Sequence, residues 1–125
     1  MTSTIRFTTE HEWVRLEDDG SMTVGITEHA QDALGDVVYI ELPELKSYTQ
    51  GEEVAVIESV KAASNIDMPL DGEVIVVNDA LEAAPETVNE DAMGAGWFFK
   101  MQAADSTAFD TLLDQAGYDA FIRSL

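Results

Sequence analysis

Three short segments with one shared pattern restrict the fold of this chain more than any other feature of its sequence. Each begins with a glycine and an acidic residue, as at a turn, and continues into a run containing β-branched residues. The three segments are Gly35–Ile40, Gly51–Val56 and Gly72–Val77. Apolar and polar residues also alternate in Glu12–Leu16 and Met22–Ile26, on either side of a turn. Runs this short predict a sheet built from hairpins, and hence a mostly β domain.

Helical signals are few and short. Thr27 can cap a helix that ends at Leu34, and Gly35 suits a left-handed helix stop. Asp79–Ala84 predicts a brief helical turn, and Trp97–Met101 predicts a final strand.

The last part of the sequence has helical spacing, with apolar residues at i, i+3, i+4 and i+7. These residues are Phe109, Leu112, Leu113 and Ala116. Thr107 and Asp110 are placed as a capping box, and Gly117 is expected to break the helix before the spacing repeats in Tyr118–Leu125. We expect a single domain over residues 1–125, with a core at about 7–103 and a C-terminal helical segment at about 106–123.

Composition excludes several classes of function. The sequence contains no cysteine, which excludes disulfides, a thiol nucleophile and thiolate metal sites. Its 25 acidic and 6 basic residues give a formal net charge of -19. Such a surface repels phosphate backbones and anionic membranes, so we expect no nucleic-acid or membrane partner, and self-repulsion favours a monomer.

The same acidity fits simple solubility, with a salt-rich cytoplasm as the alternative explanation. The sequence has no apolar run long enough to cross a bilayer and no cationic start followed by an apolar stretch. We therefore expect a cytoplasmic protein.

Lysine is scarce, and one of the three lysines has an unusual setting. Lys61 follows a β-run and lies among small residues, which places it near a hairpin tip and leaves its amine open to a modifying enzyme. A hydrated amine is charged near pH 7 and is a poor nucleophile, so an attachment point suits it better than catalysis. From spacing alone, an ordinary surface lysine remains the default interpretation.

The segment around Lys61 resembles the lipoylation motif of glycine cleavage H-proteins. The motif residues are Glu58, Ser59, Val60, Lys61 and Ala62. Eight other segments are similar to segments of that family, in the same order. They are His11–Val14, Val24–Thr27, Ala30–Gln31, Leu34–Val38, Glu41–Glu44, Gly72–Val74, Val88–Asp91 and Gly96–Trp97. The resemblance covers essentially the whole domain.

This resemblance implies a lipoyl-domain-like barrel-sandwich hybrid of two small sheets, with short helices and a C-terminal helix. It implies lipoic acid covalently attached to Lys61, as a swinging arm whose dithiolane supplies the sulfur that the sequence lacks. The chain would be a non-catalytic carrier, rather than an enzyme, that shuttles the aminomethyl intermediate of glycine catabolism. Tethering would keep that intermediate at high effective concentration.

The partners that the resemblance implies are four enzymes. They are a pyridoxal-phosphate glycine decarboxylase (P-protein), a tetrahydrofolate aminomethyltransferase (T-protein), a dihydrolipoyl dehydrogenase (L-protein) and a lipoate-attaching enzyme.

The family also folds the loaded arm into a cleft on the carrier. By position, Glu12 matches a family residue that contacts the arm or its cationic aminomethyl group. Asn65 is a possible arm contact, but relatives commonly carry an aspartate there, and Ala33 stands where some carry a histidine. We therefore expect the arm to be held less tightly here, mainly by Glu12.

Several alternatives stay open. The closest is a lipoyl relay protein that donates lipoate to other enzymes. A 2-oxoacid dehydrogenase lipoyl domain usually has Asp-Lys-Ala, and a biotin carrier Met-Lys-Met, and neither motif occurs at Lys61. A hydrolase could use Glu12 with His11 or His29, but adjacent strand residues point to opposite faces. Neither histidine has a partner at i+3 or i+4, so we expect no metal site.

Overall fold

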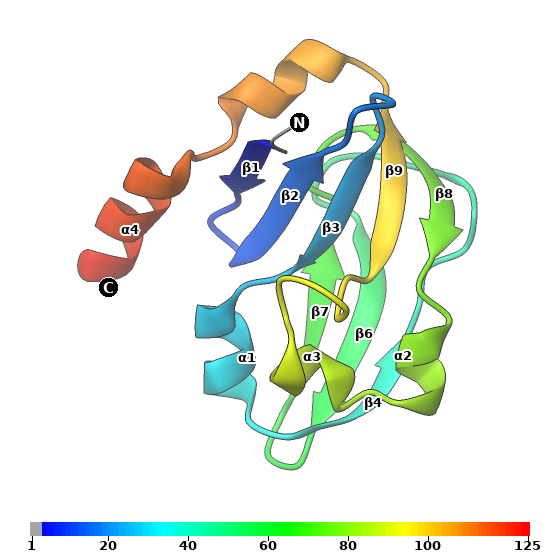
Figure 1. The fold of residues 1–125 in the computed structure, drawn as a ribbon, viewed down its shortest axis with the longest axis vertical. Coiled ribbons are helices and arrows are strands. Elements are labelled where there is room, and N and C mark those ends of the chain that lie inside the picture. Colours follow the sequence, from blue (N-terminus) through cyan, green and yellow to red (C-terminus); the bar gives the residue numbers. More distant parts are fainter. Residues whose placement is uncertain (1–3) are drawn as a thin grey trace.

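Two antiparallel sheets form the protein, and they do not close into a barrel (Figure 1). The structure is a computed structural model that describes residues 4–125, apart from the side chain of Ser106. The larger sheet has the order β1-β2-β3-β9-β8-β5 and the smaller one the order β4-β6-β7. The prediction of a mostly β fold with short helices is confirmed.

The larger sheet is built from six strands. They are β1 (Thr4–Phe7), β2 (Glu12–Leu16), β3 (Met22–Ile26), β9 (Phe99–Ala103), β8 (Gly72–Val77) and β5 (Ser47–Tyr48). Those of the smaller sheet are β4 (Val37–Glu41), β6 (Glu53–Ser59) and β7 (Ala63–Asp67). The short helices are α1 (Glu28–Leu34), α2 (Ala80–Ala83) and α3 (Thr87–Glu90), and the chain continues through a 3-10 helix, η1 (Ser106–Thr111), and α4 (Gln115–Arg123).

The core contains mainly aliphatic, methionine and aromatic side chains from both sheets. Val14, Met22 and Phe99 of the larger sheet and Ile57 and Ile66 of the smaller one are at most 1% exposed. Burying each such side chain contributes about 1.5–3 kcal/mol. Strand β3, which sequence alternation predicts, is buried at every position, so its polar Thr23 lies inside the protein together with its apolar residues.

Trp13 fixes the pairing of β2 with β3. Its indole is fully buried, and Nε1 donates a hydrogen bond to the Ala92 carbonyl at 3.0 Å. Gly25 lies opposite Trp13, and a Cβ at Gly25 would be 2.7 Å from the indole ring. Only glycine leaves room for this tryptophan, so Gly25→Ala would force the indole to move.

The helix predicted from Thr27 is confirmed. The Thr27 hydroxyl accepts a hydrogen bond from the Ala30 N–H, and Gly35 ends α1 with φ 79°. The cap is worth about 1 kcal/mol. Three short elements were not expected, namely β1, β5 and α3.

The prediction for the C-terminal segment is wrong in detail. A continuous helix over Phe109–Ala116 does not form, because Leu113 pairs as an isolated bridge with Phe7. The two residues exchange backbone hydrogen bonds of 2.7 and 2.9 Å. Tertiary pairing overrides the helical spacing at this point.

The caps in this segment also differ from the prediction. Asp105, not Thr107, caps η1, because its carboxylate accepts from the Thr107 N–H at 3.0 Å. Gly117 does not break a helix but lies in the first turn of α4, where its N–H donates to Asp114 at 2.7 Å.

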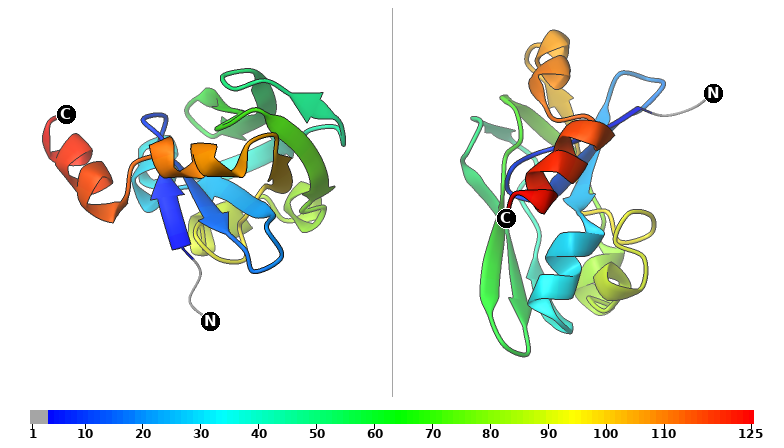
Figure 2. Two further views of the ribbon diagram at one scale, coloured as in Figure 1. Left: turned by 90° about the horizontal axis from the view of Figure 1, so that it is seen from above. Right: turned by 90° about the vertical axis from the view of Figure 1, so that its left-hand side faces the viewer.

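Helices α1 and α4 lie beside different parts of the two sheets (Figures 1 and 2). In Figure 1 the β6–β7 turn projects at the bottom, near α1, while α4 lies outside β1. Among residues 4–125, no helix is long and apolar enough to cross a membrane.

Candidate functional site: a lysine hairpin and an acid-ended cleft

Lys61 lies at the tip of the β6–β7 hairpin, as the sequence predicts. The turn is held by Ser59, whose hydroxyl accepts from the N–H groups of Lys61 at 3.3 Å and Ala62 at 3.0 Å. The Ser59 N–H donates to the Ala62 carbonyl at 2.8 Å, and the Val60 N–H donates to the Asp36 carbonyl at 3.0 Å. The backbone around the lysine is therefore fixed on both sides.

The amine of Lys61 is accessible. The residue is exposed, and so are Val60 and Ala62 beside it. Within residues 4–125, no carboxylate lies within 4.0 Å of the Lys61 amine. An acylating enzyme would thus have no ion pair to break at this amine.

Gly35 leaves space for the stem of Lys61. A Cβ at Gly35 would be 3.2 Å from Cε of Lys61, a tight contact, and the φ of 79° also disfavours any other residue. The same glycine ends α1, where its N–H donates to the Gln31 carbonyl at 3.1 Å. The lysine stem therefore passes the C-terminal end of α1.

A cleft of about 280 Å³ lies between α1, the β6–β7 hairpin and the segment before β2. It is lined by Glu10, His11, Glu12, Ile26, Ala30, Ala33, Leu34, Ile57, Ser64 and Asn65. Its lining begins at Leu34, next to Gly35, and extends to Glu12. We call it the arm cleft.

Glu12 is the buried acid of the arm cleft. Its residue exposure is 2%, and Oε2 accepts from the Asp67 N–H at 2.8 Å while Oε1 accepts from the Thr8 hydroxyl at 3.3 Å. Burial raises the pKa of Glu12 to about 8, assisted by the charges of Asp67 and Glu10 and opposed by the two hydrogen bonds. The carboxyl is therefore mostly protonated at pH 7.

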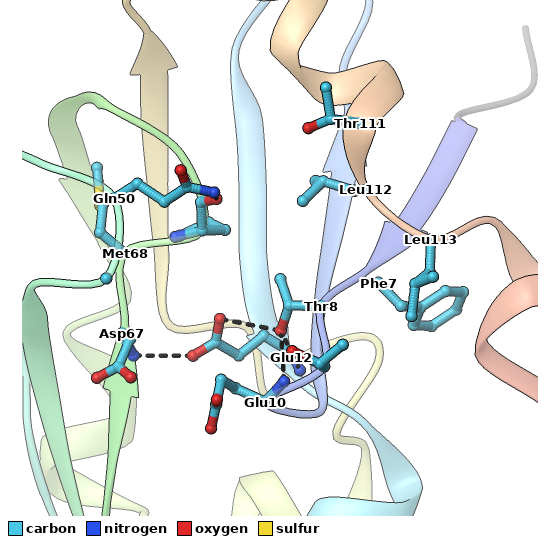
Figure 3. A pocket seen from close by; sticks show the side chains of 13 residues that line it. Phe7, Thr8, Glu10, Glu12, Gln50, Asp67, Met68, Thr111, Leu112 and Leu113 are labelled. Atoms are coloured by element: carbon cyan, nitrogen blue, oxygen red, sulfur yellow. Dashed lines mark hydrogen bonds between the residues drawn. The ribbon is translucent and has the colours of Figure 1, made fainter. Parts of the chain in front are cut away.

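A second cavity of about 330 Å³ also has Glu12 in its lining (Figure 3). Phe7, Met68 and Leu112 give it an apolar wall, and Gln50 lies at its rim. Figure 3 shows the Glu12 carboxyl between Thr8 and Asp67. Glu12 therefore borders two cavities.

His11 shapes the approach to Glu12 and was not expected to do so. It has a left-handed backbone, with φ 64°, which costs a non-glycine residue about 1–3 kcal/mol. The Tyr118 hydroxyl lies 2.8 Å from His11 Nδ1 and 2.8 Å from Thr27 Oγ1, within hydrogen-bond distance of both. Tyr118 also stacks on Phe7, with centroids 4.5 Å apart. Helix α4 thus supports the bend that precedes β2.

The bend at His11 contradicts the expectation that His11 and Glu12, as adjacent strand residues, point to opposite faces. His11 precedes β2, and both His11 and Glu12 line the arm cleft. His11 and His29, distant in sequence, have ring centroids 4.5 Å apart. Burial and the nearby His29 lower the pKa of His11, while Glu10 raises it. In the part of the chain that the structure describes, no group of three or more histidine, aspartate or glutamate residues could hold a metal ion.

The other residues selected from the sequence lie around the hairpin and cleft. Asn65 is exposed at the cleft, and its Nδ2 donates to Asp67 Oδ1 at 2.6 Å. Ala33 lines the cleft without a polar group. Glu58 is exposed and pairs across the sheet with Tyr39.

Comparison with known proteins points to one family. The model of the family described as "Glycine cleavage H-protein" matches residues 5–125. The chain is 62% identical over 122 residues to a glycine cleavage system H protein 1 of Pseudomonas aeruginosa, covering 98% of this chain and 96% of that one. It is 57% identical over 119 residues to a glycine cleavage system H protein of a Shewanella species, covering 94% and 92%.

The structural comparison agrees. A crystal structure of a glycine cleavage system H protein from Mycobacterium marinum superimposes with a TM-score of 0.86 at 32% identity, over the full length of both chains. Sequence and fold lead to the same assignment. The chain belongs to the glycine cleavage H-protein family.

Proposed function

We propose that Lys61 carries a lipoyl group and that the chain transports the aminomethyl group of glycine between the enzymes of the glycine cleavage system. Those enzymes are the glycine decarboxylase, the aminomethyltransferase and the dihydrolipoyl dehydrogenase. The observation that carries the proposal is the exposed amine of Lys61 on a hairpin tip whose backbone is fixed by Ser59 and Asp36. A rigid base with a free amine is what a tether requires.

The residues present fit a lipoyl group, which the family bears. The stem of Lys61 has space at Gly35, and the arm cleft begins beside it. Ile26, Leu34 and Ile57 give the cleft apolar surface against which a hydrocarbon chain can pack. When bound, the group would supply a reversible dithiol, which a chain without cysteine cannot supply itself.

Glu12 is the residue that would hold the cargo. A cationic nitrogen that enters the arm cleft would favour the ionised form of this carboxyl, because an opposite charge nearby lowers the pKa of an acid. Glu12 would release its proton and form a charge-assisted hydrogen bond with the nitrogen. The Asp67 N–H, 2.8 Å from Oε2, would stabilise the resulting carboxylate.

Asn65 and Ala33 limit how tightly the arm is held. Asn65 has a neutral amide that already donates to Asp67, and Ala33 offers only a methyl group to the cleft. Glu12 would therefore supply most of the attraction for a cation in the arm cleft.

The chain would act as a carrier without turnover of its own, as a cytoplasmic monomer. The alternative is a relay protein that hands lipoate to other enzymes, which would use the same lysine. The accessible amine alone supports both roles equally, whereas the buried acid at the end of the cleft favours the transport of a cationic cargo.

Replacement of Lys61 by arginine tests the proposal. We expect an intact-mass increase of one lipoyl group on the native protein after incubation with a lipoate-attaching enzyme, and no increase on Lys61→Arg. The modified protein should support glycine–bicarbonate exchange with the decarboxylase, and the variant should not. Lys100→Arg is the matched control and should behave like the native protein. Lipoylation of Lys61→Arg, or exchange that survives in it, would show that the proposal is wrong.

A further inference from the structure

Three apolar side chains are exposed beside Lys61. Val38 is 55% exposed, Tyr39 48% and Val60 68%. We call these three residues the apolar patch. Apolar side chains that are about half exposed or more lie largely outside the core, and a group of them is typical of an interaction surface.

The pairing of β4 with β6 places these residues together. Val37 pairs with Ser59 and Tyr39 with Glu58, so the register irregularity leaves Val38 between them without a partner of its own. Val37 and Ile40 are buried on either side, so the irregularity turns two consecutive residues outward. Val60 follows Ser59 directly and is joined to the start of β4 by its hydrogen bond to Asp36. The apolar patch is therefore a property of the strand pairing.

The edge of β4 is partly closed to another strand. The Val37 N–H donates to the Asn89 side chain at 2.8 Å, so this backbone group is not available for strand addition. A partner at this position would contact side chains. That favours a surface with a shape and charge that match the apolar patch.

The surroundings of the apolar patch are acidic. Asp36 just before β4, Glu41 on β4 and Glu58 on β6 are exposed next to it, and they carry the sign of the whole chain, which has a net charge of -19. A partner with an apolar centre and a rim of lysine and arginine would match this arrangement and would be steered to it.

We propose that the apolar patch is the docking surface for the enzyme that acylates Lys61, an enzyme with an apolar depression bordered by basic residues. This inference rests on the proposed function. An acylating enzyme must bring its activated acyl group to the lysine amine itself, so its surface has to contact the hairpin. Enzymes that act on the far end of a lipoyl arm can do so at a distance from the hairpin. Proximity to the amine thus assigns the apolar patch to the attachment step.

The test uses the unmodified full chain, lipoic acid, ATP and a purified lipoate–protein ligase. Val38→Thr and Tyr39→Thr are combined in one variant, since threonine has the β-branched shape that strands favour. We expect kcat/KM for lipoylation to fall about tenfold, mainly through KM. Raising the ionic strength should lower kcat/KM of the native chain, because salt screens the acidic rim.

Strand β8 offers a matched control. Its own register irregularity leaves Ile75 and Val76 exposed by 39% and 42% on the other sheet. The variant Ile75→Thr with Val76→Thr should be lipoylated within about twofold of the native rate. Equal melting temperatures of the variants and the native chain would establish that both variants are folded.

The second arm of the test separates the attachment step from the later steps. The variant with Val38→Thr and Tyr39→Thr is lipoylated to completion with excess ligase and then assayed for glycine–bicarbonate exchange, which should equal that of the native carrier. Native-like lipoylation kinetics of the variant with Val38→Thr and Tyr39→Thr would overturn the inference, and so would a selective loss of exchange. Either result leaves the proposed role of Lys61 intact, whereas lipoylation of Lys61→Arg would remove that role.

Discussion

The two ends of the arm cleft are built in opposite ways. Lys61 is exposed, and residues close to it in sequence hold it, chiefly Ser59 and Ala62. Glu12 is 2% exposed and depends on Thr8, Asp67 and, through the bend at His11, on Tyr118. The setting of Lys61 is thus mainly a local structure, and that of Glu12 is a product of the whole fold. Perturbing one end should leave the other nearly unchanged.

The largest expected effect concerns the charge of Glu12. Its pKa of about 8 lies above the ordinary 4.5, so between these pH values the folded chain binds more protons than the unfolded chain. Glu12 therefore makes the free energy of unfolding fall as pH rises from about 4.5 to 8, by on the order of 3–5 kcal/mol. Glu12→Gln should remove this decline, as measured by urea unfolding at several pH values.

His11 also contributes to the pH dependence of the free energy of unfolding, and comparison of the native chain with Glu12→Gln corrects for it. The pKa of His11 is lowered from 6.5, so His11 makes stability fall as pH drops below 6.5, opposite in sign to Glu12. The difference between Glu12→Gln and the native chain isolates the glutamate. A pH-independent difference would contradict the raised pKa.

In the loaded carrier, Glu12→Gln should shorten the lifetime of the bound aminomethyl group, and an unchanged lifetime would exclude Glu12 as its holder.

The next effect tests whether α4 supports the bend before Glu12. Tyr118→Phe keeps the stacking on Phe7 but removes the hydroxyl between His11 and Thr27, leaving the buried Thr27 hydroxyl without this partner. We expect a loss of about 1–3 kcal/mol in the free energy of unfolding and a shorter lifetime of the loaded arm. Lipoylation of Lys61 should proceed at the native rate. A slowed lipoylation would show that the two ends are coupled.

The smallest effect concerns the hairpin. Ser59→Ala removes the hydroxyl that accepts from Lys61 and Ala62, and because the site is partly exposed the cost should be about 0.5–1 kcal/mol. Lipoylation should slow modestly, whereas the pH dependence that Glu12 causes should persist. Ser59→Thr keeps the hydroxyl and serves as control. If Ser59→Ala altered the lifetime of the loaded arm instead, the hairpin would not be a purely local structure.

The same contrast explains what the sequence could predict. The strands Met22–Ile26 and Gly72–Val77 have the predicted bounds, because alternation and turn residues are local signals. The turn at Lys61 could be predicted for the same reason. Strand β5 was missed because two residues carry too little pattern. Helical structure does occupy Ser106–Thr111 and Gln115–Arg123, within the expected segment, but it is interrupted because Leu113 pairs with Phe7, a contact that helical spacing cannot reveal.

The surroundings of Glu12 were less predictable from the sequence. Glu12 was selected from a family resemblance, and no local pattern indicates that a glutamate next to a tryptophan is buried. The supporting role of His11 depends on Tyr118, 107 residues away, so it becomes visible only in the folded chain. A histidine followed by an acid gives no signal of a left-handed backbone.

The long separation between His11 and Tyr118 has a consequence for biosynthesis. A ribosome makes His11 early and Tyr118 only 107 residues later, while the strands of the Lys61 hairpin, Glu53–Ser59 and Ala63–Asp67, follow one another closely. The hairpin can assume its shape while translation continues, but the bend before Glu12 must wait for α4. A nascent chain would thus complete the turn around Lys61 before the surroundings of Glu12.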